Sequence, residues 1–403
     1  MTNARQERGL MIAAIAKIKQ KDGAWVVPSQ SGKEPYKVRV GEQPHCTCQD
    51  HETRGCKCKH IFAVEYVIQR EENNDGTTTV TETLTISATK RKTYPQNWPA
   101  YNAAQTNEQD QFQVLLHDLC NGISNPPRGK GRPPLAMADV VFSATFKVYS
   151  TVSGRRFISD LRDAHEKGRV TKLIHYNSIF KYLEDEALTP ILKGLIVESS
   201  KPLSSIESDF AVDSTGFTCS RYIRWYDHKY GAVAQQHDWV KAHFCTGVKT
   251  NVITAVEILD RNAADGAQLP ALVETTANNF KMGEISGDKA YASLANFNVI
   301  DKVGATPYIP FKARHTGAIG GLFQKAFHYF NFKRDEFLAH YHKRSNVEST
   351  VSMIKAKFQD HVRSKTEVAM KNEVLCKILC HNICCLISAM YELGIDPKFG
   401  QAA

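Results

Sequence analysis

Two aspartates stand where a carboxylate could hold a metal ion. Asp213 ends the apolar run Phe210–Val212, and Asp288 follows the short run Glu284–Gly287. Both patterns predict a buried strand that meets a loop. A carboxylate at such a strand end suits a hard cation such as Mg²⁺, which takes oxygen ligands and keeps positions open for phosphate and water. Taken alone, either aspartate is also typical of a turn or a helix cap.

A third acidic residue, Glu348, belongs to a patterned helix. Tyr341, Arg344, Glu348 and Lys355 are spaced i, i+3, i+7 and i+14, which places them in a stripe about 60° wide on one helix. An adjacent stripe is apolar and consists of Val347, Val351, Ile354 and Phe358. The two stripes predict a helix with one packed face and one face directed at a site. The alternative is a solvated charged face, which seldom includes a tyrosine.

This spacing resembles a known signature. Tyr341-x₂-Arg344-x₃-Glu348-x₆-Lys355 matches the Y-R-E-K pattern of insertion-sequence DDE transposases, which are mobile-element enzymes with a ribonuclease H-like core. The first two acidic positions of that family match Asp213 and Asp288, in the order strand, strand, helix. Further family landmarks match Trp225, Tyr230–Gly231, Tyr308–Pro310 and Asn382. The resemblance covers residues 111–393.

The resemblance implies a DNA transposase that cleaves at the ends of an insertion sequence and joins them to target DNA. Asp213, Asp288 and Glu348 would bind two Mg²⁺ or Mn²⁺ ions, which activate the nucleophile and stabilise the leaving oxygen. The other signature residues would hold phosphates near the cleaved end, namely Tyr341, Arg344 and Lys355. Double-stranded DNA is the expected partner, bound by a homodimer on paired ends.

Two other functions remain open from the sequence. One is a non-catalytic, zinc-dependent DNA-binding or regulatory protein derived from a transposase. The other is a ribonuclease H-like nuclease that cuts without joining. The presence of all three acidic residues argues against the first, and the complete signature argues against the second.

The segment before Glu348 departs from better-known relatives. Only 59 residues separate Asp288 from Glu348, so the large β insertion of some relatives is absent or reduced to a short loop. The segment 312–344 instead combines basic residues with Phe323, Phe327, Tyr329 and Phe330. Such a mixture suits a DNA backbone and an exposed base, although the aromatic residues could equally form a core.

A cysteine and histidine cluster near the N-terminus predicts a zinc site. Cys46, Cys48, Cys58 and His60 offer three thiolates and an imidazole, the tetrahedral set that a structural Zn²⁺ prefers. The C-x-C, spacer, C-x-H pattern resembles a SWIM zinc finger. The nearby Cys56 and His51 are further candidate ligands. Trp25–Val27 and Tyr36–Val40 alternate like a hairpin, and Ile61, Val64 and Ile68 mark one face of a helix.

Basic residues elsewhere suggest further DNA contacts. Arg132, between Gly131 and Pro133, resembles the core of an AT-hook, in which arginine enters the A·T minor groove. The alternative interpretation of this segment is a Pro-rich connector. Recognition of element ends is expected in the helical segment 136–203, with Arg155, Arg156, Arg162, Arg169, Lys172 and Lys181. A purely structural helical layer is the alternative there.

Composition sets the frame for these sites. The chain of 403 residues is 42% hydrophobic and 23% charged, with a net charge of +9, which is typical of a globular protein and favours a polyanionic partner. No apolar run approaches the roughly 18 residues that span a bilayer, so we expect a cytoplasmic protein without a membrane partner. The 11 cysteines suit metal ligation and packing in a reducing compartment.

Four regions are expected to position these residues. They are a zinc finger over 1–70, a linker with a basic Pro/Gly run over 71–134, a helical DNA-binding region over 135–205 and an α/β, ribonuclease H-like catalytic domain over 206–395. Within the last, the patterns predict strands at Phe210–Val212, Val240–Val248, Val252–Leu259, Glu284–Gly287 and Pro307–Phe311, and helices at Leu269–Asn279, Ala292–Val303 and Ser345–Phe358. Asp265 and His243 are lesser site candidates, and Cys376, Cys380 and Cys384 are expected to pack inside a helix.

Overall fold

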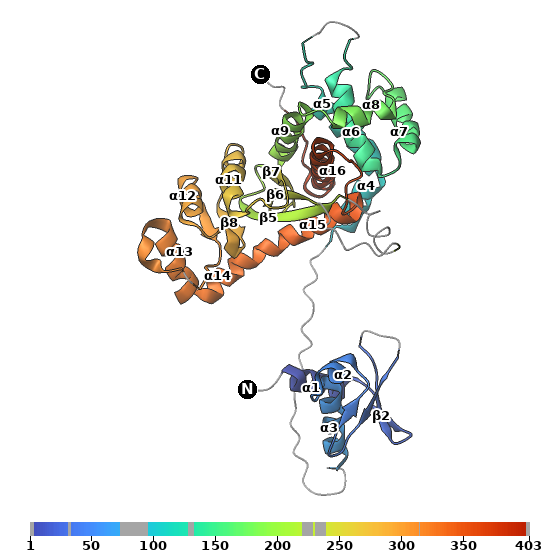
Figure 1. The fold of residues 1–403 in the computed structure, drawn as a ribbon, viewed down its shortest axis with the longest axis vertical. Coiled ribbons are helices and arrows are strands. Elements are labelled where there is room, and N and C mark those ends of the chain that lie inside the picture. The colour runs from blue at the N-terminus through green and yellow to red at the C-terminus, as the bar shows by residue number, and fades with distance from the viewer. Residues whose placement is uncertain are drawn as a thin grey trace. The chain divides into compact units, whose positions relative to one another are not determined.

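A computed structural model describes residues 4–30, 34–72, 96–127, 133–219, 229, 239–313 and 315–399. The contacts divide the chain into two units, Met1–Tyr94 and Pro95–Ala403, and both are drawn in Figure 1. Several residues named above lie outside the described ones: the AT-hook-like Arg132, Trp225 and Tyr230–Gly231.

The N-terminal unit packs helices against a small antiparallel sheet with the strand order β1-β2-β3-β4. The β2–β3 hairpin is the one that the alternating sequence predicts, with Trp25 opposite Val38. Helix α1 crosses α3 closely, because a Cβ at Gly9 would lie 2.6 Å from the Cβ of Phe62. The elements are α1 (Ala4–Ile15), β1 (Lys19–Lys21), β2 (Ala24–Val27), β3 (Tyr36–Arg39), β4 (His45–Cys46), α2 (Gln49–Arg54) and α3 (Lys59–Glu72).

The second unit is built on a mixed five-stranded sheet, ordered β7-β6-β5-β8-β9. Strand β5 is central: it pairs antiparallel with β6 and parallel with β8. The five predicted strands are confirmed, although β9 is shorter than expected. Their bounds are β5 (Asp209–Thr218), β6 (Trp239–Gly247), β7 (Ile253–Leu259), β8 (Glu284–Gly287) and β9 (Thr306–Tyr308).

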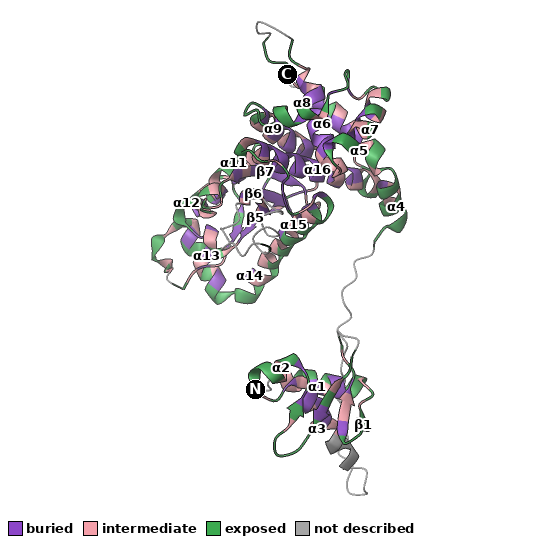
Figure 2. Ribbon diagram, turned by 45° about the vertical axis from the view of Figure 1, so that its right-hand side comes forward, coloured by how far each residue is buried: buried purple, intermediate pink, exposed green. Residues whose placement is uncertain are grey.

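Each face of this sheet contributes to its own core, because side chains alternate along a strand. Ala211 and Phe217 of β5 belong to a core with α16 and α6, whereas Phe210 and Val212 belong to one with α11 and α12. Figure 2 shows buried residues in β5, β6, β7 and α16, and exposed ones on the outer sides of α12, α13 and α14. The predicted α/β class is confirmed, and its form is a mixed sheet flanked by helices.

The helices of the second core lie between Asp265 and the end of α14. They are η2 (Gly266–Gln268), α11 (Leu269–Ala277), η3 (Lys289–Tyr291), α12 (Leu294–Lys302), η4 (Gly317–Ile319), α13 (Gly321–Phe332) and α14 (Arg334–Tyr341). A 3₁₀ turn, η5 (His342–Arg344), then leads into α15 (Ser345–Phe358), and α14 and α15 run past β8 and β5 (Figure 1). The predicted helix at Ser345–Phe358 is confirmed at both ends.

The remaining helices gather around the long α16 (Glu367–Leu393). Helix α16 is apolar and long enough to cross a membrane, but 78% of its most apolar window is buried inside the unit, so this is weak evidence for a span. Cys376 and Cys380 are fully buried, as expected. Asn382 joins α16 to β7, since its Oδ1 accepts from Ile253 N at 2.8 Å and its Nδ2 donates to Ile253 O at 2.7 Å.

The linker expected over 71–134 requires a correction, because it contains two packed helices. Phe112 and Leu116 of α5 are fully buried, and the Phe112 ring stacks on Tyr149 at 3.9 Å. The apolar spacing of these residues favours burial against α6 and α16 over a solvated connection. The helices are α4 (Trp98–Thr106), α5 (Glu108–Cys120), α6 (Met137–Ser150), α7 (Gly154–Glu166), α8 (Tyr176–Leu183), α9 (Leu188–Ser200) and η1 (Lys201–Leu203).

Candidate active site and metal centre

The strand register brings Asp213 and Asp288 together. The parallel β5–β8 ladder ends at the pair Val212 and Gly287, so the next residue of each strand is an aspartate. Asp288 directly follows β8, as the sequence predicts. Asp213 differs from the expectation, because β5 continues to Thr218 against β6. Asp213 is therefore the first β5 residue beyond the shorter neighbouring strand, rather than the last residue of its own.

Glu348 joins this pair through Arg344. The Arg344 Nη1 atom lies 2.8 Å from Asp213 Oδ2, and its Nη2 atom lies 2.8 Å from Glu348 Oε1. The Asp213 and Arg344 side chains are 23% and 20% exposed, whereas that of Glu348 is 65% exposed. One guanidinium thus spans a carboxylate of the sheet and a carboxylate of α15. These two contacts of Arg344 tie α15 to the sheet.

The electrostatics explain why a cation belongs here. Burial raises the pKa of Asp213, and the charges of Asp288 and Glu348 raise it further; the Ser214 N–H and Arg344 offset only part of this. A carboxylate that is buried beside other negative charges is harder to ionise, and Asp213 is in that position. The group therefore gains from any cation that lies among its oxygens, and in this structure that cation is Arg344.

Asp288 is held by the turn that follows it. Its Oδ1 accepts from Ala290 N at 2.6 Å. The same turn carries Tyr291, whose side chain is 1% exposed and whose hydroxyl has no hydrogen-bond partner among the described residues. Burial raises the pKa of Tyr291, and the charges of Asp265, Asp213 and Asp288 raise it further, so the hydroxyl stays protonated.

Sequence reasoning did not single out Tyr291 as a site residue. The available signal was its place three residues after Asp288, in the sequence Gly287-Asp-Lys-Ala-Tyr291. Asn296 positions the turn, because its Nδ2 donates to Tyr291 O and to Gly266 O, both at 2.9 Å. Since Asn296 is itself buried, this contact is shielded from water.

A second polar group lies on the opposite face of β5. The Asp265 Oδ1 atom accepts from Ser214 Oγ at 2.9 Å and lies 2.6 Å from Lys241 Nζ. His243 Nδ1 is 3.3 Å from the same oxygen. Ser214 pairs with His243 across the ladder, so both side chains point away from the face of Asp213. Asp265 and His243 therefore support β5 next to Asp213, and Lys241 is a member that sequence reasoning missed.

The other signature residues lie along α14, η5 and α15. Tyr341 ends α14, and the Arg344 guanidinium carbon lies 5.9 Å from its ring centroid. The Lys355 Nζ atom lies 5.6 Å from the ring centroid of Phe217, on the β5 face of Asp213. Between Tyr341 and α15 the 3₁₀ turn is anchored by Lys343, which bonds Asp209 at 2.7 Å and Glu284 at 2.8 Å. The signature therefore follows two helices and a turn rather than one uninterrupted helix.

The acidic trio has the oxygen donor set that suits Mg²⁺ or Mn²⁺. The oxygens of the trio are not close enough together to form a complete ligand shell. Among the described residues, ligand atoms that all lie within 4.8 Å of one another are found in the group Cys46, Cys48, Cys58 and His60. The trio therefore fits a divalent ion by chemistry, with Arg344 as the present counter-charge.

The cysteine and histidine cluster is fully enclosed in the N-terminal unit. Cys46 Sγ and Cys58 Sγ lie 3.7 and 3.8 Å from His60 Nδ1, and the ring of Tyr36 stacks on His60 at 4.3 Å. All four residues are at most 4% exposed. The arrangement is compatible with a zinc site.

Two further candidate ligands lie outside that group. Cys56 is half-buried and its carbonyl oxygen accepts from His51 Nδ1 at 2.8 Å. Neither residue belongs to the cluster of four, so the C-x-C and C-x-H positions alone supply its ligand atoms.

The basic and aromatic segment 312–344 is largely structural. Phe323 and Phe330 are buried in the core beside α12, and Arg334 lies 4.8 Å from the Phe330 ring centroid. Helices α13 and α14 fill the part of the described chain in which some relatives carry a β insertion. In the helical region, by contrast, Arg155, Arg156 and Arg162 are exposed on α7.

Residues 204–383 match a family model described as "Transposase DDE domain". The match covers just under half of the chain and includes Asp213, Asp288 and Glu348. It supports a DDE transposase, and the mixed sheet flanked by helices is consistent with such a domain. No curated protein and no solved structure matches the chain.

The burial of Asp213 beside two other carboxylates predicts that Asp213→Asn stabilises the metal-free protein at neutral pH. A carboxyl group whose folded pKa is raised favours folding below its unfolded pKa and loses that contribution as the pH rises through the folded value. Asparagine stays neutral, so the Tm of the variant should exceed that of the wild type at pH 7.5 without divalent cations. The gap should close towards pH 4.

Thermal melts across this pH range measure the effect, with the exposed Asp301→Asn as the matched control. A variant that melts below the wild type at pH 7.5, by an amount that does not depend on pH, would contradict the electrostatic account.

The cysteine cluster predicts one zinc ion per chain. Cys58→Ser and His60→Ala each remove a buried ligand and should reduce the bound zinc severalfold, measured by mass spectrometry of the purified protein. Cys56→Ser is the matched control and should retain the metal. Equal zinc loss in all three variants would show that the ligand set is wrong.

Proposed function

We propose that this protein is a DNA transposase that cleaves at the ends of an insertion sequence and joins them to target DNA. The observation that carries the proposal is the meeting of three carboxylates. The strand register sets Asp213 beside Asp288, and Arg344 contacts both Asp213 and Glu348. This arrangement lies inside the segment that matches the transposase domain. A ribonuclease H-like core for residues 206–395 is part of the proposal.

The three carboxylates would hold two Mg²⁺ or Mn²⁺ ions, which supply an activated oxygen nucleophile and stabilise the leaving oxygen of an in-line displacement. Asp213 and Asp288 are fixed by the sheet and by the turn at Ala290. Glu348 is mostly exposed and completes the group from α15. The buried Tyr291 hydroxyl stays protonated near these carboxylates.

Arg344 has two roles in this proposal. Without DNA it neutralises Asp213 and Glu348, which would otherwise repel each other. With DNA bound, its planar fork of donors suits a phosphate. Tyr341 of α14 and Lys355 of α15 hold phosphates on either side of the cleaved position. These residues position the strand and do not exchange protons with it.

The other regions supply recognition. Residues 1–70 are a SWIM-like zinc finger with a structural Zn²⁺, and the exposed arginines of α7 within 135–205 contact the element ends. Arg132 enters a minor groove. The enzyme acts in the cytoplasm as a homodimer on paired double-stranded DNA ends.

Glu348→Gln is expected to abolish strand cleavage and strand transfer while DNA binding persists. Loss of one carboxylate ligand removes several kcal/mol of transition-state stabilisation, which corresponds to a fall in rate on the order of 10³-fold. The assay uses radiolabelled DNA carrying the element ends, with Mg²⁺, and scores both products.

Glu367→Gln serves as the control, because Glu367 also lies in the first turn of a helix and pairs with a residue four positions away, Lys371. Cleavage by Glu348→Gln at the wild-type rate would refute the assignment. Cleavage without joining by the wild type would instead identify a nuclease, and DNA binding without either product a regulatory protein.

A further inference from the structure

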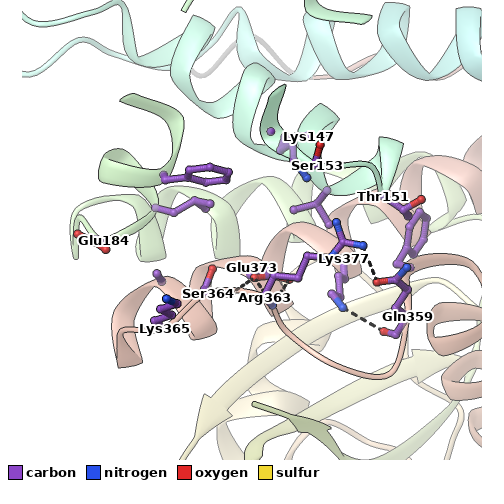
Figure 3. A pocket seen from close by; sticks show the side chains of 16 residues that line it. Lys147, Thr151, Ser153, Glu184, Gln359, Arg363, Ser364, Lys365, Glu373 and Lys377 are labelled. Atoms are coloured by element: carbon purple, nitrogen blue, oxygen red, sulfur yellow. Dashed lines mark hydrogen bonds between the residues drawn. The ribbon is translucent and has the colours of Figure 1, made fainter. Parts of the chain in front are cut away.

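A cavity of about 460 Å³ lies apart from the carboxylates in the second unit. It is bounded by the end of α6, the start of α7, α8, the end of α15 and the beginning of α16. Its volume falls within the range of small-molecule sites, roughly 300–1,000 Å³. Figure 3 shows the side chains that surround it.

Lys147 is the unusual member of this cavity. It is 7% exposed, and its ammonium group has no hydrogen bond or ion pair with any described residue. Burial lowers the pKa of Lys147 to about 8, so the side chain still carries its charge at neutral pH. A mostly buried charge that faces a cavity without a partner is poorly solvated, and an anion in the cavity would supply that partner.

The nearby carboxylate does not fill this role. Glu373 accepts from Arg363 N at 3.0 Å and from Ser364 N at 2.8 Å, so its oxygens are directed at the backbone. No ion pair joins it to Lys147 among the described residues. Glu373 therefore orders the loop before α16 and leaves the ammonium group of Lys147 available.

Two more cations face the same space and meet only neutral oxygens. Lys377 Nζ donates to Gln359 O at 3.0 Å. The Arg363 guanidinium donates to Val152 O and to Gln359 Oε1, both at 3.2 Å, and Figure 3 draws the Gln359 contacts. With Lys365 the lining carries four cationic side chains against two carboxylates, so the cavity attracts anions.

The remaining lining suits a flat apolar ring. Phe180 is 42% exposed although it lies beside the cavity. Its ring is held against the start of α7, because a Cβ at Gly154 would lie 2.7 Å from Phe180 Cζ. Leu183 and Phe358 add apolar surface. A ring held in place and open on one side is a stacking platform for a nucleobase.

The cavity also adjoins the strand that carries Asp213. Lys377 Nζ lies 5.6 Å from the ring centroid of Phe217, and Lys355 Nζ lies at the same distance from that ring. Phe217 is four residues beyond Asp213 on β5. Lys355 and the cavity residue Lys377 therefore approach the same ring.

We propose that this cavity binds a nucleotide, with its phosphate on Lys147 and its base against Phe180. The nucleotide is an unpaired residue of the DNA on which the enzyme acts, a source that rests on the proposed function; a free nucleotide shares the same chemistry.

Calorimetric titration with thymidine 5′-monophosphate and with inorganic phosphate tests the site itself. Lys147→Met preserves the length of the side chain and should weaken binding of both probes at least about tenfold, since it removes a charge-assisted hydrogen bond. Phe180→Ala should weaken the nucleotide and not inorganic phosphate. Lys302→Met, an exposed lysine of α12, should change neither. Unchanged nucleotide affinity in both cavity variants would overturn the proposal.

A second measurement identifies the source of the nucleotide. A duplex with a one-nucleotide bulge and its fully paired counterpart are titrated with Glu348→Gln protein, so that cleavage plays no part. Preference for the bulged duplex that disappears with Lys147→Met supports a DNA nucleotide. Mononucleotide binding without that preference would overturn the DNA source. Both results stand whether or not the enzyme transfers strands.

Discussion

The second unit is organised around the repulsion of carboxylates at one place on its sheet. Asp213 and Asp288 follow the last residue pair of a parallel ladder, and α15 brings Glu348 to them. Burial, and then the charges of Asp288 and Glu348, raise the pKa of Asp213, so a nearby cation favours its ionised form. Arg344 supplies the cation from within the chain, and its two contacts at 2.8 Å couple the sheet to the helix that completes the site.

Several contacts hold this arrangement in place at a distance. Asp265 and Lys241 support β5 from its other face, through Ser214. Lys343 attaches the turn before α15 to the first residues of β5 and β8. Asn382 ties the edge strand β7 to the buried α16. The carboxylates can therefore be crowded because the elements carrying them are fixed by contacts that do not involve those carboxylates.

Local patterns predicted much of this architecture. Glu284–Gly287 and Ser345–Phe358 were predicted at their observed bounds, because a short apolar run and a helical double stripe depend only on neighbouring residues. The helices α4 and α5 were missed because a polar stretch on one side and a Pro/Gly run on the other suggested a linker, while their buried faces are explained only by α6 and α16.

Several contacts at the candidate site could not be predicted for the same reason, because they join residues from separate elements. Spacing placed Arg344 near Glu348, but its contact with Asp213 joins residues 131 positions apart. Tyr291 and Lys241 are notable only through side chains that face them from other elements. The cavity around Lys147 draws on five elements, so no single segment reveals it.

If the three carboxylates form one cation site, a divalent ion must compete there with Arg344. Electron paramagnetic resonance of Mn²⁺ titrated into the wild type, Asp213→Asn and Arg344→Ala measures this most directly. The account predicts Mn²⁺ binding by the wild type, weaker binding by Asp213→Asn and tighter binding by Arg344→Ala. Equal Mn²⁺ affinity in all three proteins would contradict it.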